Sequence, residues 1–288
     1  MTGDALAAAE RRLAAAGVPT PRNDAELLVR HVTGWGRGEL LLRRARPMPA
    51  DAGDRLEPLV ARRAAREPLQ LILGSVGFRH LDLLVRPGVF LPRPETEVLA
   101  GEAADRTPAG GVVVEPCTGT GAIACAVASE SAPGRVLATD VSAEAVALAR
   151  ENAARCGVAV EVGRGDLLGP VPRALRGHVD VLVCNPPYVA EAELAGLEPE
   201  VRDWDPVAAL VSGPTGNEVV ERLVDAAPRW LRPGGWLLLE LDPARAAVTA
   251  ARCRVAGLTD VGVVRDLAGR DRIVLARHGM RSSSAGAI

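Results

Sequence analysis

The chain has 288 residues with a formal net charge of −2, and 48% of them are hydrophobic and 24% charged. This composition is typical of a globular protein of one or two domains, and the near-neutral charge gives no reason to expect nucleic-acid binding. No apolar stretch approaches the ~20 residues of a membrane span and no signal peptide opens the chain, so we expect a cytoplasmic protein.

The first 66 residues predict helices. Apolar residues recur at three- and four-residue spacing in three segments, which chain breaks rich in Gly and Pro separate. The helices are expected at 5–16, 24–32 and 51–65.

In residues 68–97 the helical patterns give way to short extended runs. The short runs 69–73 and 81–86 lie around Gly74, Gly77 and His80, and we predict that they form a hairpin or paired strands. The stretch Pro92–Glu97 follows, and its prolines and acids favour the start of a helix that continues through Leu99 and Ala103.

From residue 111 onward, apolar strand patterns alternate with helical ones, which predicts a mainly parallel sheet covered on both faces. Only residues 266–271 join the last two strands, too few for a helical crossover, so that pair should be antiparallel. The residues from 279 to 288 are expected to be a disordered tail. The predicted strands are 111–115, 135–140, 158–162, 179–184, 235–241, 261–265 and 272–277, and the helices are 121–130, 143–156, 217–227 and 243–256.

A glycine turn follows the first strand of this region. Gly119 and Gly121 lie between an apolar strand and an alanine-rich helix, and Asp140 ends the next strand, 19 positions after Gly121. Dinucleotide-binding proteins place an acid at about this spacing for ribose hydroxyls. The glycine pattern is partial, because Cys117 replaces its first glycine and Ala124 its last. This argues against NAD and favours a nucleoside without a pyrophosphate, for which S-adenosylmethionine is a suitable candidate.

A second motif, Asn185-Pro186-Pro187-Tyr188, follows the apolar strand 179–184. Pro186 keeps Asn185 out of the helical region, and neither proline has an N–H. The segment therefore offers carbonyl and amide oxygens as acceptors beside a flat ring, a cup suited to a planar NH2 group. Ligands of open α/β sheets bind beyond the strand C-termini, where both motifs should converge. Asn-Pro after a strand also marks ordinary turns.

The five cysteines are scattered, without Cys-x-x-Cys spacing, so we predict neither a disulfide framework nor a metal site. Asp166 follows a third strand end and is the candidate for the adenine side of a cofactor, with an exposed turn aspartate as the alternative. The predicted cofactor-binding residues are Glu115, Cys117, Thr118, Gly119, Gly121, Asp140, Asp166 and Asn185.

The chain resembles the N5-glutamine methyltransferases that act on peptide-chain release factors, the HemK-type family. The likeness spans nearly the whole sequence. Its most specific parts are the stretch Pro92–Glu97, the tetrapeptide at 185–188 and Asp266-Leu267-Ala268-Gly269-Arg270. The tetrapeptide alone also occurs in adenine-N6 DNA methyltransferases.

This resemblance implies a fold of class α/β, with a seven-stranded Rossmann-like methyltransferase domain, a small helical N-terminal domain and a hairpin linker. We place the helical substrate-recognition domain at 1–68, the linker at 69–92 and the methyltransferase domain at 93–278. The implied enzyme transfers a methyl group from S-adenosylmethionine to the N5 amide of glutamine in the Gly-Gly-Gln motif of class 1 release factors. We expect a monomer.

The residues expected to do this chemistry surround the acceptor amide. The Asn185 oxygen and the Pro186 carbonyl would accept its two N–H groups, so that its lone pair faces the methyl group. The predicted catalytic residues are Asn185, Pro186, Pro187 and Tyr188, and the predicted substrate-binding residues are Arg93, Glu95, Asn185, Pro186 and Tyr188.

Three alternatives stay open. The chain departs from the family pattern at Glu115-Pro116-Cys117 and at Asp242-Pro243, which leaves room for a paralogue that methylates another amide or amine. An adenine-N6 nucleic-acid methyltransferase would need stacking aromatics and a basic track, which this composition lacks. A binding module without catalysis would bind the cofactor without turnover.

Overall fold

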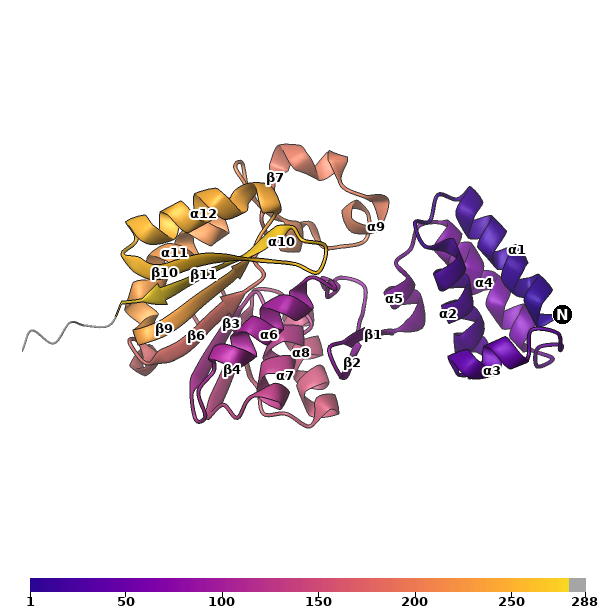
Figure 1. The fold of residues 1–288 in the computed structure, drawn as a ribbon, viewed down its shortest axis with the longest axis horizontal. Coiled ribbons are helices and arrows are strands. Elements are labelled where there is room, and N and C mark those ends of the chain that lie inside the picture. The colour runs from indigo at the N-terminus through magenta and orange to yellow at the C-terminus, as the bar shows by residue number, and fades with distance from the viewer. Residues whose placement is uncertain (280–288) are drawn as a thin grey trace, which may run out of the picture. The chain divides into compact units, whose positions relative to one another are not determined.

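The computed structural model describes residues 1–279 and consists of two compact units (Figure 1). The first unit comprises Met1–Ser75 together with Glu198–Trp204, and the second comprises Val76–Leu197 and the chain from Asp205 onward. This division differs from the predicted domains in that a short segment from the later sequence joins the first unit. Apart from Gly279, the predicted tail lies outside the described residues.

The first unit is helical, and its helices pack around one apolar cluster that includes Leu13, Leu28 and Val29. Each long helix buries residues at three- and four-residue intervals, as an amphipathic helix does. Helix α2 shows both end signals, with Pro21 at its first turn and Gly34 in the left-handed conformation after its end. The helices are α1 (Thr2–Ala15), α2 (Pro21–Thr33), α3 (Arg37–Leu42), α4 (Ala52–Ala64), α5 (Leu69–Leu73) and α9 (Pro199–Arg202).

The predicted strand at 69–73 is wrong, because this segment is helix α5. Leucine and glutamine are good helix formers, and Gly74 ends the helix in the left-handed conformation, with φ of +78°. The two-stranded sheet instead pairs β1 (Ser75–Phe78) with β2 (Leu81–Leu84).

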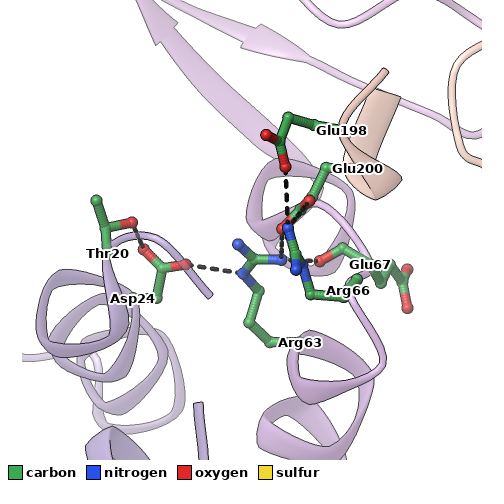
Figure 2. A network of polar contacts seen from close by, with 7 residues as sticks. All are labelled: Thr20, Asp24, Arg63, Arg66, Glu67, Glu198 and Glu200. Atoms are coloured by element: carbon green, nitrogen blue, oxygen red, sulfur yellow. Dashed lines mark hydrogen bonds and ion pairs between the residues drawn. The ribbon is translucent and has the colours of Figure 1, made fainter. Parts of the chain in front are cut away.

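A network of arginines and acids lies within the first unit (Figure 2). The Arg63 guanidinium donates to Asp24 Oδ2 at 2.7 Å and to Glu200 Oε1 at 3.0 Å. Arg66 also donates to Glu200, at 2.6 and 2.5 Å. The side chains of Arg63 and Asp24 are only 6% and 4% exposed. This network joins the later segment, residues 198–204, to the helices of the first unit.

The second unit is built on a seven-stranded sheet in the order β10-β11-β9-β6-β3-β4-β5. Strand β11 is antiparallel to both β10 and β9, as predicted for the last pair, whereas β9, β6, β3, β4 and β5 are mutually parallel. The strands are β3 (Val112–Pro116), β4 (Arg135–Asp140), β5 (Glu161–Arg164), β6 (Val179–Cys184), β9 (Leu231–Glu240), β10 (Leu258–Arg265) and β11 (Asp271–His278).

Successive residues of the central strands bury into different clusters, because side chains alternate across a sheet. Val114 and Leu182 enter one cluster, with residues of α11 and α12. Val113 and Val181 enter the other, with residues of α6, α7 and α8. The sheet is thus covered on both faces. The helices are α6 (Thr96–Arg106), α7 (Ala122–Glu130), α8 (Ala143–Cys156), α11 (Glu218–Trp230) and α12 (Pro243–Val255).

All seven predicted strands are present, with shifts at their ends. Strand β5 runs from Glu161 to Arg164 rather than over 158–162, and β9 begins at Leu231, four residues early. The remaining elements are short and lie in connections: η1 (Arg173–Leu175), β7 (Val189–Ala190), η2 (Glu191–Gly196), α10 (Val207–Leu210) and β8 (Val211–Gly213). None of the described helices is long and apolar enough to cross a bilayer.

Candidate active site

The two sequence motifs meet at the point where the strand order of the sheet reverses. Strand β3 pairs with β4 on one side and with β6 on the other. The glycine turn follows β3, and the tetrapeptide follows β6. In open α/β sheets, ligands bind beyond the carboxyl ends of the strands at such a switch point.

The backbone of the glycine turn is held in unusual conformations. Cys117, Gly119 and Gly121 all have positive φ, of 56°, 55° and 81°. A Cβ on Gly121 would lie 3.1 Å from Cβ of Ala149 in α8, so glycine is required there for both conformation and space. Left-handed backbone at a non-glycine residue such as Cys117 costs free energy and is found preferentially at functional sites.

Glu115 supports this turn from beneath. Its Oε2 accepts hydrogen bonds from Thr118 Oγ1 at 2.7 Å and from the backbone N–H of Ala124 at 2.9 Å. The side chain is buried, and burial raises the pKa of Glu115 to about 8, although these two hydrogen bonds act in the opposite direction. The carboxyl therefore ties the turn to the start of α7.

Asp140, at the end of β4, holds the turn from the side. Its Oδ2 accepts from the N–H of Gly119 and its Oδ1 from the N–H of Ser142, each at 2.9 Å. A carboxylate has about four lone-pair positions, so acceptor capacity remains for a ligand.

The tetrapeptide contributes two of its four residues to the main cavity. This cavity has a volume of about 220 Å³, and its lining includes Asn185 and Pro187 together with Gly119 and Asp140. A smaller cavity of about 30 Å³ also contains Asn185 in its lining. Four residues line both cavities: Phe90, Cys117, Gly119 and Asn185.

The other two residues of the tetrapeptide lie behind this lining. Pro186 is buried, and Tyr188 packs against the apolar cluster under α11 and α12. Burial raises the pKa of the Tyr188 hydroxyl, and the nearby acid Glu240 acts in the same direction. Neither Pro186 nor Tyr188 is among the described residues that line the two cavities.

The remaining predicted residues are distributed around the site. Asp166 lines the main cavity, is exposed and forms an ion pair with Arg222. Glu115 and Thr118 line the smaller cavity. Arg93 and Glu95 line neither cavity: Arg93 forms an ion pair with Asp205, and Glu95 one with Arg270 at 2.7 Å.

Three further residues of the site are not among the predicted site residues. Thr96 Oγ1 accepts a hydrogen bond from Asn185 Nδ2 at 3.3 Å. The buried Asn152 donates to the carbonyls of Leu84 and Thr120, which joins β2 to the glycine turn. Glu240, the last residue of β9, is also buried. Burial raises the pKa of Glu240 to about 7, and its Oε2 has no hydrogen-bond partner among the described residues.

The described residues contain no group of three or more potential metal ligands, and all five cysteines are free thiols. Cys184 Sγ donates to the Pro116 carbonyl at 3.0 Å. This contact links the ends of β6 and β3 directly beneath the two motifs.

Comparison with known proteins agrees with this architecture. Residues 4–74 match the family model described as the PrmC N-terminal domain, and residues 82–197 match the methyltransferase small domain. A methyltransferase structure from Pyrococcus furiosus has a TM-score of 0.53 and 22% identity, covering 70% of this chain and 91% of that one. This likeness shows the fold.

Curated relatives are similar over nearly their full length. A release factor glutamine methyltransferase of Mycolicibacterium smegmatis is 46% identical, over 96% of this chain and 98% of that protein. One of Streptomyces coelicolor is 43% identical, over 96% and 97%. The chain therefore belongs to the family of release factor glutamine methyltransferases and is an enzyme of the class I methyltransferase fold.

Proposed function

We propose that this protein transfers a methyl group from S-adenosylmethionine to the side-chain amide nitrogen of a protein glutamine. The acceptor is the Gly-Gly-Gln motif of a class 1 peptide-chain release factor, in the cytoplasm. The names of the curated relatives support this acceptor. The observation that carries the chemistry is that Asn185 lines both the main cavity and the smaller one beside it.

The residues around the main cavity fit a nucleoside cofactor. Asp140 lines the cavity and retains acceptor capacity for ribose hydroxyls. Beside it, Cys117 and Gly119 of the glycine turn have positive φ angles. Asp166 also lines this cavity and is exposed, so it is available for a contact with the adenine. When bound, S-adenosylmethionine supplies an electrophilic methyl group on its sulfonium.

Asn185 orients the acceptor amide. Its Nδ2 is engaged by Thr96, so Oδ1 is the atom left to accept an N–H from the substrate. We expect the carbonyl of Pro186, the residue directly behind the cavity lining, to accept the second N–H, because the two prolines have no N–H that would compete as donors. With both N–H groups held, the nitrogen lone pair would face the methyl group, and the hydrogen bonds strengthen as positive charge develops on nitrogen. The N–C bond would form as the S–C bond of the sulfonium breaks, and the nitrogen would then lose one of its two protons to solvent.

The test of this mechanism is the variant Asn185→Ala. Losing a hydrogen bond that strengthens in the transition state lowers kcat by about 100- to 1000-fold. The dissociation constant of S-adenosylmethionine, measured by calorimetry, should stay within about twofold because the nucleoside contacts remain. The exposed Asn23→Ala in the first unit is the matched control and should keep wild-type turnover.

The acceptor is tested with labelled S-adenosylmethionine and a purified bacterial class 1 release factor. A release factor with Gly-Gly-Asn in place of Gly-Gly-Gln is the control. Label transferred to the first and not to the second supports the proposal. Cofactor binding without transfer to either protein would reject the release factor as acceptor and favour a paralogue that methylates another amide or amine.

A further inference from the structure

Asp205 is a deeply buried acid at the start of a cavity wall. Its side chain is 1% exposed and forms an ion pair with Arg93, whose side chain is 26% exposed. Its Oδ1 also accepts from the backbone N–H of Leu91 at 3.4 Å. Both partners are more than 110 residues away in sequence, so Asp205 joins two distant segments of the second unit.

The two segments that Asp205 joins are both walls of the main cavity. On one side, residues 88–90 line the cavity, and the Arg93 guanidinium lies 4.9 Å from the ring centroid of Phe90. On the other side, Pro206, Ala208, Ala209 and Val211 line it. A change at Asp205 would therefore reach the cavity through Phe90 and through Pro206.

The wall from 206 to 211 has few other attachments. At its far end, β8 pairs with β7, a strand of only two residues that directly follows Tyr188. At its near end, the described attachment is the contact of Asp205 with Leu91 and Arg93. The far end is also held by a hydrogen bond of 2.8 Å from the N–H of Val219 to Ser212 Oγ, and Leu210 is buried. The near end depends on the contacts of Asp205 for its position.

The charge state of this pair follows from its surroundings. Burial raises the pKa of Asp205, while Arg93 and the N–H of Leu91 act in the opposite direction. A buried carboxylate is tolerated only with a cation and hydrogen bonds. Arg93 thus contacts both Asp205 and the face of Phe90.

We propose that Asp205 is a positioning residue that, through Arg93 and Leu91, holds the two walls of the main cavity at the separation that the cofactor requires. This inference rests on the proposed function for the identity of the cofactor. It assigns to Arg93 a part in shaping the cavity.

The experiment compares Asp205→Asn with the matched control Asp203→Asn, an exposed acid in the same loop that pairs with Arg202. Calorimetry with S-adenosylmethionine should give a dissociation constant about tenfold higher for Asp205→Asn, because a charge-assisted hydrogen bond is lost. Asp203→Asn should change it by less than about twofold, since exposed pairs contribute little. Amide hydrogen exchange of residues 206–211 should become about tenfold faster in Asp205→Asn alone.

Arg93→Met provides an independent route, because this side chain is partly exposed. It should raise the dissociation constant of S-adenosylmethionine as Asp205→Asn does. The dissociation constant of the double variant should not exceed the larger of the two single-variant values. Unchanged exchange of 206–211 in folded Asp205→Asn would overturn the inference, as would additive effects of the two substitutions. A wild-type protein that binds the cofactor but does not methylate the release factor would reject the proposed acceptor alone. If the wild-type protein does not bind S-adenosylmethionine, the proposed function fails while the exchange measurement still decides whether Asp205 holds the wall.

Discussion

Acids of the helical unit and acids beneath the candidate active site are stabilised in different ways. In the helical unit, Asp24 and Glu200 each receive hydrogen bonds from arginine. Burial acts to raise the pKa of Glu200, but the arginines outweigh it and the pKa is lowered. In the sheet unit, Glu115 and Glu240 lie beneath the candidate active site, and burial raises their pKa values to about 8 and about 7.

This difference separates structural acids from acids that can hold a proton near neutral pH. An arginine partner stabilises the charged form of a carboxylate and lets the pair join distant segments, at the cost of desolvating two charges. Acids that burial shifts toward neutrality are more frequent at functional sites. Asp205 lies between the two cases, because it has an arginine partner and yet its pKa is raised by burial.

The largest effect is expected from removing one partner of a buried arginine–carboxylate pair in the helical unit. Arg63→Ala leaves the buried Asp24 without its cation, which should lower the free energy of unfolding of the helical unit by about 3–5 kcal/mol. Urea denaturation, followed by a probe in the helical unit, measures it. Arg12→Ala is the matched control, because Arg12 and its partner Glu57 are 45% and 70% exposed, and it should cost less than about 1 kcal/mol. Equal losses of unfolding free energy in the two variants would contradict the expected difference between buried and exposed ion pairs.

A smaller, pH-dependent effect is expected at Glu115. Its folded-state pKa lies above the unfolded value, so its contribution to stability is fully present below about pH 4.5 and is lost as the pH rises to about 8. Glu115→Gln cannot ionise, so it should match the wild type near pH 5 and exceed it by about 1–3 kcal/mol at pH 8.5. Denaturation across this pH range measures the difference.

Glu161→Gln is the control for that series. Glu161 is 59% exposed, and its pKa is lowered, chiefly by a hydrogen bond from Arg135. Its contribution should therefore fade only as the pH falls below the usual carboxyl range. A Glu115→Gln variant that follows the wild-type profile would mean that the pKa of Glu115 is the same in the folded and unfolded states, and would contradict this prediction.

The smallest effect is expected for an exposed pair. Arg222 and Asp166 form an ion pair at 2.5 Å, with side chains 55% and 59% exposed. Arg222→Ala should change the free energy of unfolding by less than about 1 kcal/mol, and added salt should remove even that difference. A larger loss that persists at high salt would show that geometry alone makes an exposed pair stabilising.

The sheet could be predicted from local patterns, because its strands and helices each repeat apolar residues at their own period. The site could be predicted where a motif stands at a strand end, as at Gly119, Asp140 and Asn185. The segment 69–73 could not, since a five-residue run with four apolar residues suits a short helix and a short strand equally well.

Other parts of the site depend on contacts between residues far apart in sequence. In the sequence, Thr96 indicates only the start of a helix and Glu240 only the end of a strand. The fold brings both of them to the tetrapeptide region. Asn152 lies on a helix, 68 positions from its partner Leu84. The pairing of Arg63 with Glu200 spans 137 positions. No local pattern encodes such pairs, because each residue alone is compatible with a solvated surface.

Because Glu198–Trp204 belongs to the helical unit, the coding sequence of this unit is not continuous. A fragment that stops at Ser75 would contain Arg63 and Arg66 without the carboxylate that both of them bind. Exchanging the N-terminal unit between relatives as one continuous cassette would mismatch the same partners. A successful chimera must transplant two separate stretches of coding sequence, one from the beginning of the chain and one from its middle.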